Sequence, residues 1–165
     1  MSLPFHIFLH VALSFLIGYI IFNNFHRGFL AYIGTFIGGV LVDLDHFIDY
    51  FLTFGIQFNL HYFLKGYQFL KSEKIYILFH AWEYVGILII TYYLLTIRRR
   101  ITLAVFVLAL SLGLGGHLII DTIINHIKPQ TYSITYRIIN NFDAKYLIYP
   151  KYWKNDQQII KKVTF

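Results

Sequence analysis

The sequence predicts an all-α, polytopic membrane protein: a four-helix transmembrane bundle followed by a C-terminal interfacial extension. Hydrophobic residues make up 58% of the 165 positions and charged residues only 13%, a composition that lies outside the range usual for soluble proteins. The apolar residues fall into four segments, each long enough to cross a bilayer as a helix of roughly 20 residues. The eight acidic residues concentrate inside or at the edge of these segments.

The four predicted spans cover about residues 3–22, 29–54, 75–97 and 101–127. Residues 23–28 and 98–100 are short connections, so the first and second spans, and the third and fourth, should form antiparallel hairpins. The link from residue 55 to residue 74 is longer, aromatic and basic, which favours a position at the membrane interface. We therefore expect a multi-pass, integral protein with its spans alternating in direction.

The chain divides by composition into a transmembrane domain at residues 1–127 and an extension at 128–165. The extension combines seven Lys and Arg residues with several Tyr and a Trp, and such side chains favour the headgroup layer. The net charge of +6 is not patterned as a groove-binding surface, so nucleic acid is not an expected partner, whereas anionic lipid is. The Arg98–Arg100 cluster argues for one membrane orientation and the tail for the other, so the orientation stays open.

Acidic residues are costly in hydrocarbon unless they are paired, hydrated or bound to a cation. Five of the eight lie in or beside apolar segments, and each has histidine nearby in sequence: Asp43, Asp45, Asp49, Glu83 and Asp121. Carboxylate and imidazole from several helices form the ligand set of Zn, Fe or Mn sites. Cysteine is absent, so a thiolate ligand is excluded.

The alternating helix directions predict where these side chains meet. His6, His10, His80 and Glu83 come near the beginning of the first and third spans. The acids of residues 43–49 and the residues 117–126 come late in the second and fourth. Because odd-numbered helices begin on the face where even-numbered helices end, all of these groups should converge on one membrane face.

Within the second span, Asp43 and His46 are three residues apart, and Asp45 and Asp49 four apart, so each pair shares a helix face. Three carboxylates within two turns repel each other unless a cation or protons neutralise them. The alternative is a hydrated helix end, and Asp49 is the residue best suited to be such a surface acid.

The other spans carry shorter patterns. His117 and Asp121 share a face of the fourth span, and the preceding glycines, like Gly38 and Gly39, would let two membrane helices approach closely. His80 and Glu83 share a face as a ligand pair, a ligand with its general base, or a simple hydrogen-bonded pair. His10 is favoured over His6 on depth, and His26 and His61 are read as non-ligands.

At these residues the chain resembles the YdjM-type family of small membrane-bound, metal-dependent hydrolases. That family has an N-terminal His, a P-D-x-D-H motif ending a membrane helix, a central His motif and a later G-x-x-x-H-x-x-x-D motif. The matching positions are His6 or His10, the run Val42–His46, His80, and the run Gly113–Asp121. Val42 stands in place of the proline, and Phe79–Glu83 in place of the family's H-R-G-x-T-H-S. The resemblance covers roughly residues 1–127 and implies metal-dependent hydrolysis.

We therefore expect hydrolysis of a lipid-linked or other amphiphilic ester or phosphoester, at one or two divalent transition-metal ions, with Zn favoured over Mn or Fe. The expected ligands are His10, Asp43, Asp45, His46, His80, His117, Asp121 and His126, with Glu83 or Asp49 taking the proton. The setting would be a prokaryotic cytoplasmic membrane. A metal-binding or metal-transport protein is the alternative, and a di-iron oxidase, which would need repeated Glu-x-x-His pairs, ranks third.

Overall fold

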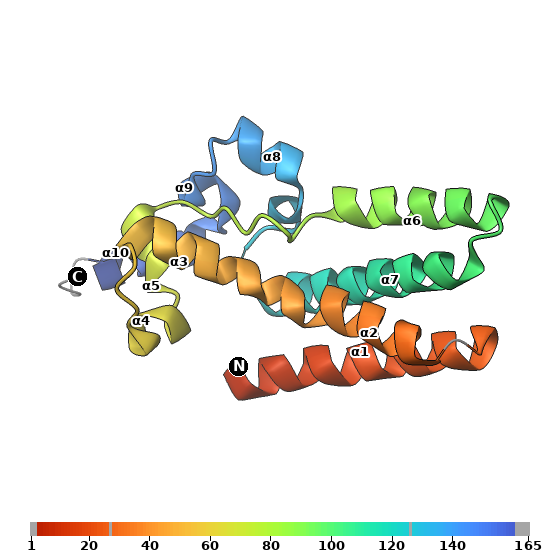
Figure 1. Cartoon of the computed structure of the whole chain (residues 1–165). Helices are drawn as coiled ribbons and strands as arrows, with labels where there is room; N and C mark the ends of the chain where they lie inside the picture. Colours follow the sequence, from red (N-terminus) through yellow and green to blue (C-terminus); the bar gives the residue numbers. More distant parts are fainter. Residues whose placement is uncertain (1–2, 27, 126, 161–165) are drawn as a thin grey trace. The chain divides into compact units, whose positions relative to one another are not determined.

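The chain is all-helical in the part that the computed structural model describes, residues 3–26, 28–125 and 127–160 (Figure 1). Apart from two isolated β-bridges, between Lys74 and Asp143 and between Ile127 and Ile148, these residues contain no strand. The elements are α1 (Leu3–Phe25), α2 (Gly28–Gly39), the 3-10 helix η1 (Leu41–Asp45), α3 (His46–Phe54), α4 (Leu60–Leu64), α5 (Tyr67–Ser72), α6 (Trp82–Ile97), α7 (Ile101–Ile124), the 3-10 helix η2 (Pro129–Tyr132), α8 (Ile134–Ile139), α9 (Ala144–Leu147) and α10 (Pro150–Ile160). The expected all-α class is therefore confirmed.

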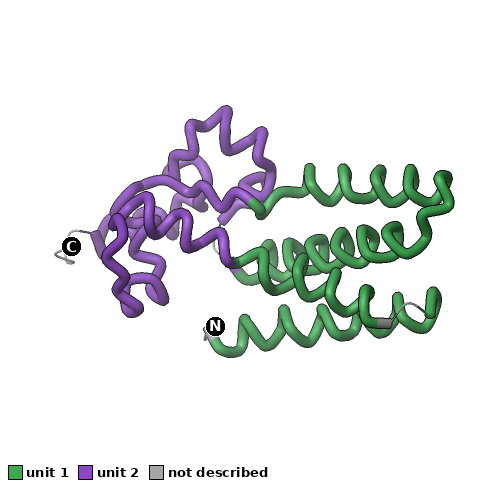
Figure 2. Tube along the Cα trace, in the orientation of Figure 1, with its two compact units in different colours: residues 1–43, 79–124 green, residues 44–78, 125–165 purple. Residues whose placement is uncertain are grey.

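The helices group into two compact units (Figure 2). Unit 1 comprises residues 1–43 and 79–124, and unit 2 comprises residues 44–78 and 125–165. The expected division at residue 127 followed composition alone. In the structure, the middle link and the C-terminal segment, distant in sequence, belong to the same unit.

Unit 1 is built from α1, α2, α6 and α7. Helix α7 contacts each of the other three, and its most extensive contact is with α2. Towards the start of α7 the interior is apolar, where Ile21, Ala31, Val105 and Ala109 pack together. Many large apolar side chains on the outside of α1 and α6 remain exposed, among them Phe8, Phe15, Ile90 and Tyr93.

Glycines make the α2–α7 contact possible. A Cβ added to Gly38 would lie 2.2 Å from the backbone oxygen of Leu110, and one added to Gly113 would lie 2.6 Å from the backbone oxygen of Thr35. Neither distance is sterically allowed, so each of these positions accepts only glycine at the present helix separation. The close contact that the sequence predicted between these two segments is what the structure shows.

The apolar helices are consistent with a membrane protein. Two described helices, Pro4–Phe25 and Ile101–Ile124, are long and apolar enough to cross a bilayer, and a third span results if the broken pair Phe29–Gly39 and Leu41–Phe54 counts as one. Helix α6 is apolar but shorter, with 16 residues. The described residues therefore form a helical protein with two to three candidate spans, and the four-helix transmembrane bundle stays a prediction.

The predicted second and third spans are not continuous helices. The second breaks after Gly39 and passes through η1 before α3 begins at His46. Paired glycines are weak helix formers, and the aspartates that follow favour helix ends over helix interiors. The third begins as a helix only at Trp82, because residues 75–81 run as an irregular segment in which Ile77 has a φ of 33°.

Unit 2 is held together by two buried polar side chains. Asp49 on α3 accepts hydrogen bonds from the backbone N–H groups of Tyr76 at 2.9 Å and Ile77 at 3.0 Å. Arg137 on α8, fully buried, donates to the backbone oxygens of Thr131 at 2.6 Å and Ile77 at 3.1 Å. These bonds satisfy backbone groups that no helix or sheet satisfies, which explains why an irregular segment is tolerated in a buried position.

Candidate metal centre

Within unit 1, the structure brings together six imidazole and carboxylate side chains from four parts of the chain. Helix α1 supplies two histidines, η1 one aspartate, the residue two positions before α6 one histidine, and α7 a histidine and an aspartate: His6, His10, Asp43, His80, His117 and Asp121. In each of three overlapping groups of three, the ligand atoms lie within 4.8 Å of one another. These six residues are among those that the alternating helix directions predict to lie close together.

His117 is oriented by the backbone of α2. Its ring is buried, and Nδ1 donates a hydrogen bond of 3.0 Å to the carbonyl oxygen of Gly39. Because a carbonyl only accepts, this bond places the proton on Nδ1 and leaves the lone pair on Nε2. A second hydrogen bond of this kind is usual for metal-binding histidines.

The Nε2 atom of His117 faces a second ring nitrogen and two carboxylate oxygens. Nε2 lies 3.0 Å from His80 Nε2, 3.4 Å from Asp43 Oδ1 and 3.4 Å from Asp121 Oδ2. His80 Nε2 is itself 3.2 Å from Asp43 Oδ1. Acceptors that converge at these distances in a buried site repel each other unless a cation, either a proton or a metal ion, lies among them.

The second oxygen of Asp121 faces the histidines of α1. Oδ1 lies 3.1 Å from His6 Nε2 and 3.3 Å from His10 Nε2, and the two ring nitrogens are 2.6 Å apart. Despite these distances, Oδ1 is buried and accepts no hydrogen bond of good geometry from the described residues. The rings of His10 and His117 stack at 3.9 Å between centroids, so the two halves of the cluster are in direct contact.

Two of the six side chains in the cluster are partly exposed and the other four are buried. The side chain of Asp43 is 34% exposed and that of His6 17%, whereas those of His10, His80, His117 and Asp121 are 3% exposed or less. A molecule approaching the cluster would therefore meet Asp43 and His6 first. The remaining four side chains are withdrawn from solvent, which strengthens their interaction with any bound cation.

The expected ligands Asp45 and His46 belong to unit 2, where His46 Nδ1 lies 3.7 Å from the fully buried Asp45. Asp49 is also in unit 2, where it is 2% exposed and both of its oxygens accept backbone N–H groups. The alternative of a hydrated surface acid therefore does not describe Asp49, and its catalytic role stays a prediction. His126 lies outside the described residues.

Glu83 stands in the first turn of α6 and is half-buried. The predicted helical spacing does not apply to His80 and Glu83, because α6 begins at Trp82 and His80 precedes it in irregular backbone. The two side chains therefore share no helix face, although both belong to unit 1.

The sequence favoured His10 over His6 as a ligand, and no pattern in it indicated a role for the Gly39 carbonyl. His6 joins the cluster together with His10, one turn along α1, and the H-x-x-x-H spacing was the available signal. The Gly39 carbonyl carries no signal of its own, because its role depends on how closely α2 approaches α7.

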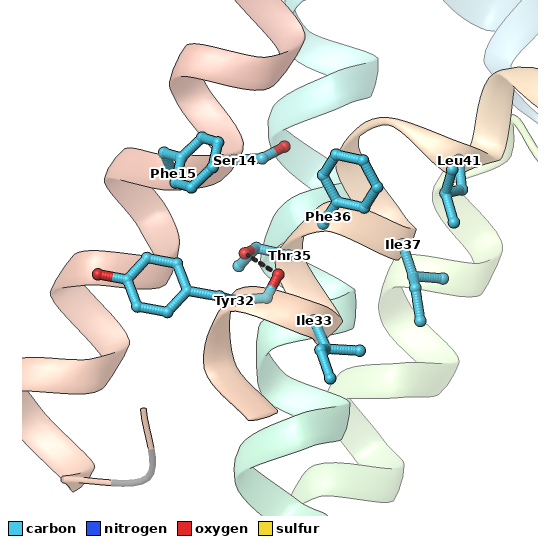
Figure 3. Close-up of a pocket in the computed structure, with 8 residues that line it drawn as sticks. All are labelled: Ser14, Phe15, Tyr32, Ile33, Thr35, Phe36, Ile37 and Leu41. Atoms are coloured by element: carbon cyan, nitrogen blue, oxygen red, sulfur yellow. Dashed lines mark hydrogen bonds between the residues drawn. The ribbon is translucent and has the colours of Figure 1, made fainter. Parts of the chain in front are cut away.

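An apolar groove lies between α1 and α2, also in unit 1 (Figure 3). Its volume is about 460 Å³, and it is lined by Ser14, Phe15, Tyr32, Ile33, Thr35, Phe36, Ile37 and Leu41. Ser14 is one helical turn along α1 from His10, so the groove begins close to the cluster. Thr35 directs its hydroxyl to the backbone oxygens of Ala31 and Tyr32, which leaves an almost wholly apolar lining.

Comparison of the chain with protein-family models, with curated proteins and with solved structures gives no match.

Proposed function

We propose that the protein is a membrane-embedded, metal-dependent hydrolase whose substrate is a lipid-linked or other amphiphilic ester or phosphoester. One observation carries the proposal: four buried and two partly exposed imidazoles and carboxylates converge from four parts of unit 1, with His117 oriented by a backbone carbonyl. Such a cluster in an apolar setting is expensive to maintain, which favours a function for it.

The donor set fits a divalent transition metal. Imidazole and carboxylate without thiolate suits Zn, Mn or Fe, with Zn the first choice for hydrolysis. A bound ion of this kind lowers the pKa of a coordinated water toward neutrality and polarises the scissile group. His10, His80, His117 and Asp121 would hold it from the buried side, with His6 and Asp43 at the open side.

A proton acceptor is needed beside the donors. Glu83 stays the favoured residue, because it lies in unit 1, is half-buried and begins the helix that follows His80. Asp49 is less suited to the task, because both of its oxygens already accept backbone hydrogen bonds.

The apolar groove supports an amphiphilic substrate. A hydrocarbon chain in the groove of Figure 3 would leave a polar headgroup near Ser14, one turn of α1 from His10. Many apolar side chains of α1 and α6 are exposed, which favours lipid as the surroundings of unit 1. The headgroup of a membrane lipid could then reach the cluster without leaving the bilayer.

Transport of a metal across the membrane is the less favoured function. A transport path needs polar groups beyond the cluster, whereas the apolar core formed by Ile21, Ala31, Val105 and Ala109 occupies the other part of unit 1. The buried hydroxyl of Ser111 donates to the backbone oxygen of Val85 at 3.2 Å and so is not arranged to pass an ion.

The test uses the full chain purified in a mild detergent. We expect stoichiometric transition metal by elemental analysis, and hydrolysis of at least one member of a panel of lipids and lipid-linked phosphoesters. His117→Gln should lose metal and activity, whereas His61→Gln, which changes an exposed histidine in unit 2, should retain both. Metal binding without hydrolysis across the panel would refute the hydrolase and leave a metal-binding protein, and absence of metal would refute both.

A further inference from the structure

The two oxygens of Asp121 face different histidine pairs. Oδ1 lies 3.1 Å and 3.3 Å from the Nε2 atoms of His6 and His10, both on α1. Oδ2 lies 3.4 Å and 3.8 Å from the Nε2 atoms of His117 and His80. A carboxylate that presents one oxygen to each of two ligand groups has the arrangement of a bridge between two metal ions.

We infer that Asp121 bridges two divalent cations. His6, His10 and Asp121 Oδ1 hold the first, and His80, His117, Asp43 Oδ1 and Asp121 Oδ2 hold the second. The inference rests on the metal centre of the proposed function, although not on hydrolysis itself. Two ions bridged in this manner are a recurrent design in enzymes that hydrolyse phosphoesters, where they lie roughly 3.5–4 Å apart.

One ion does not satisfy both groups. An ion held only by the α1 histidines leaves three acceptors facing one another, His117 Nε2 and the near oxygens of Asp43 and Asp121. A neutral His80 can supply a single proton to this group through its Nε2 atom, which is fewer than the acceptors need. An ion held only by the second group leaves Asp121 Oδ1 buried without a well-formed hydrogen bond from the described residues. A buried polar group without a partner destabilises the folded state, and the cost is larger when the group is charged.

The number of donors points the same way. The six side chains offer seven ligand atoms when both oxygens of Asp121 are counted. A Zn site uses three or four protein ligands, so one ion would leave about half of the donors without a role. Divided between two ions, the donors give three protein ligands to one and four to the other.

Two ions also favour a class of substrate. The two carboxylates of the cluster offset only half of the charge of two dications, so the site keeps an excess of positive charge on its open side, at Asp43 and His6. An anionic phosphoester offsets this excess, whereas a neutral carboxylic ester does not. The inference therefore selects a phosphoester-bearing amphiphile from the two substrate types of the proposed function.

The decisive measurement is metal stoichiometry on the full chain in detergent, after removal of metal and reloading with Zn²⁺ or Mn²⁺. We expect two ions per chain in the wild type. His6→Gln with His10→Gln should reduce this to one, because the second group is left intact, and His61→Gln should leave two. Paramagnetic resonance of the Mn²⁺-loaded wild type should show two coupled ions, a signature that needs no variant.

Inorganic phosphate supplies the test of charge. It should bind to the two-ion form and bind at least tenfold more weakly to the His6/His10 variant. One uncoupled ion per wild-type chain would overturn the inference and leave the proposed function standing, whereas no ion would overturn both. Loss of both ions in a folded His6/His10 variant would overturn the division of ligands, and the wild-type spectrum decides the matter if that variant does not fold.

Discussion

The orientation of His117 depends on the carbonyl group of a closely packed glycine. Gly39 provides the carbonyl that accepts from His117 Nδ1, and a Cβ at this position would lie 2.1 Å from Ser14 Oγ. A side chain at residue 39 would therefore press against Ser14 of α1 and shift the carbonyl group that orients His117. An imidazole whose second nitrogen is held in this way loses affinity for metal when the holding group moves.

Gly39→Ala should destabilise the protein by about 1–3 kcal/mol, the usual cost of overpacking, and weaken metal binding about 10- to 100-fold. Thermal unfolding and metal titration in detergent would measure the two effects. Adding Ser14→Ala should recover part of both losses, because the nearest clashing atom is removed. Additive losses in the double variant would contradict this account.

A variant of Asp49 can distinguish a structural role of this carboxylate from a catalytic one. Asp49→Asn removes one of the two acceptors that hold the backbone of Tyr76 and Ile77, so stability should fall by about 1–3 kcal/mol. Metal stoichiometry and the turnover per bound metal should remain at the wild-type level, because both oxygens of Asp49 are already engaged by backbone N–H groups. A Glu83→Gln variant is the matched comparison and should lose turnover while keeping metal. Loss of turnover in the stable fraction of Asp49→Asn would restore the catalytic role predicted from sequence.

At the scale of elements, the contact between α2 and α7 decides whether a site forms. It brings the end of α2, and with it Asp43, beside the His117 and Asp121 turn of α7. The clashing atoms at Gly38 and Gly113 are backbone atoms, which no change of side-chain rotamer can move. This contact should therefore tolerate substitution less well than a contact between side chains.

Gly38→Ala should cost more stability than Gly39→Ala and should lower metal content, because α2 and α7 must separate. Gly86→Ala is the matched control: it lies on α6, and nothing lies within 4 Å of its added Cβ. The control should be neutral or slightly stabilising, since Ala favours helix more than Gly. Thermal unfolding of the two variants side by side measures the difference, and equal effects would contradict the packing argument.

The groove between α1 and α2 gives a prediction about substrate length. Ile33→Trp should fill the groove and lower kcat/KM for long-chain substrates at least tenfold, while a short-chain, water-soluble analogue reacts at the wild-type rate. Ile90→Trp, an equally bulky change on an exposed position of α6, is the control and should affect neither. Parallel loss on both substrates in Ile33→Trp would mean that the groove does not hold the chain.

Some helices could be predicted from hydrophobicity and others could not. Apolar length predicted α1 and α7 within a few residues, because uninterrupted helices follow hydrophobicity closely. The same measure joined α2 to α3, and joined residues 75–81 to α6. Apolar residues in irregular buried backbone look the same as apolar residues in a span. What distinguishes them is the partner of each backbone N–H, such as Asp49 for Tyr76 and Ile77.

For the whole molecule, metal and stability should be coupled. The cluster without cations holds two carboxylates among imidazoles in a buried site, so bound metal should favour the folded state. A chelator should lower the thermal midpoint, and re-addition of metal at 100 times its dissociation constant should restore about 2.7 kcal/mol. Acidification should release the metal, because bound imidazole must be neutral. The His117→Gln variant should show a much smaller response, and an equal response would place the metal elsewhere.

The helical class, the membrane-compatible composition and most of the candidate ligands follow from the sequence, because hydrophobicity and the cost of buried charge are properties of local sequence. It also grouped the ends of the helices, since alternating directions follow from short connections. Five of the six side chains that meet in unit 1 were among its expected ligands: His10, Asp43, His80, His117 and Asp121.

How those side chains face one another depends on the tertiary fold. The separation of the Asp121 oxygens between two histidine pairs, the proton on His117 Nδ1 and the structural use of Asp49 all depend on distances between segments far apart in the chain. Such distances depend on how closely the helices approach one another at Gly38, Gly39 and Gly113. The glycines in a sequence indicate that a close approach is possible, but they do not indicate which atoms it brings together.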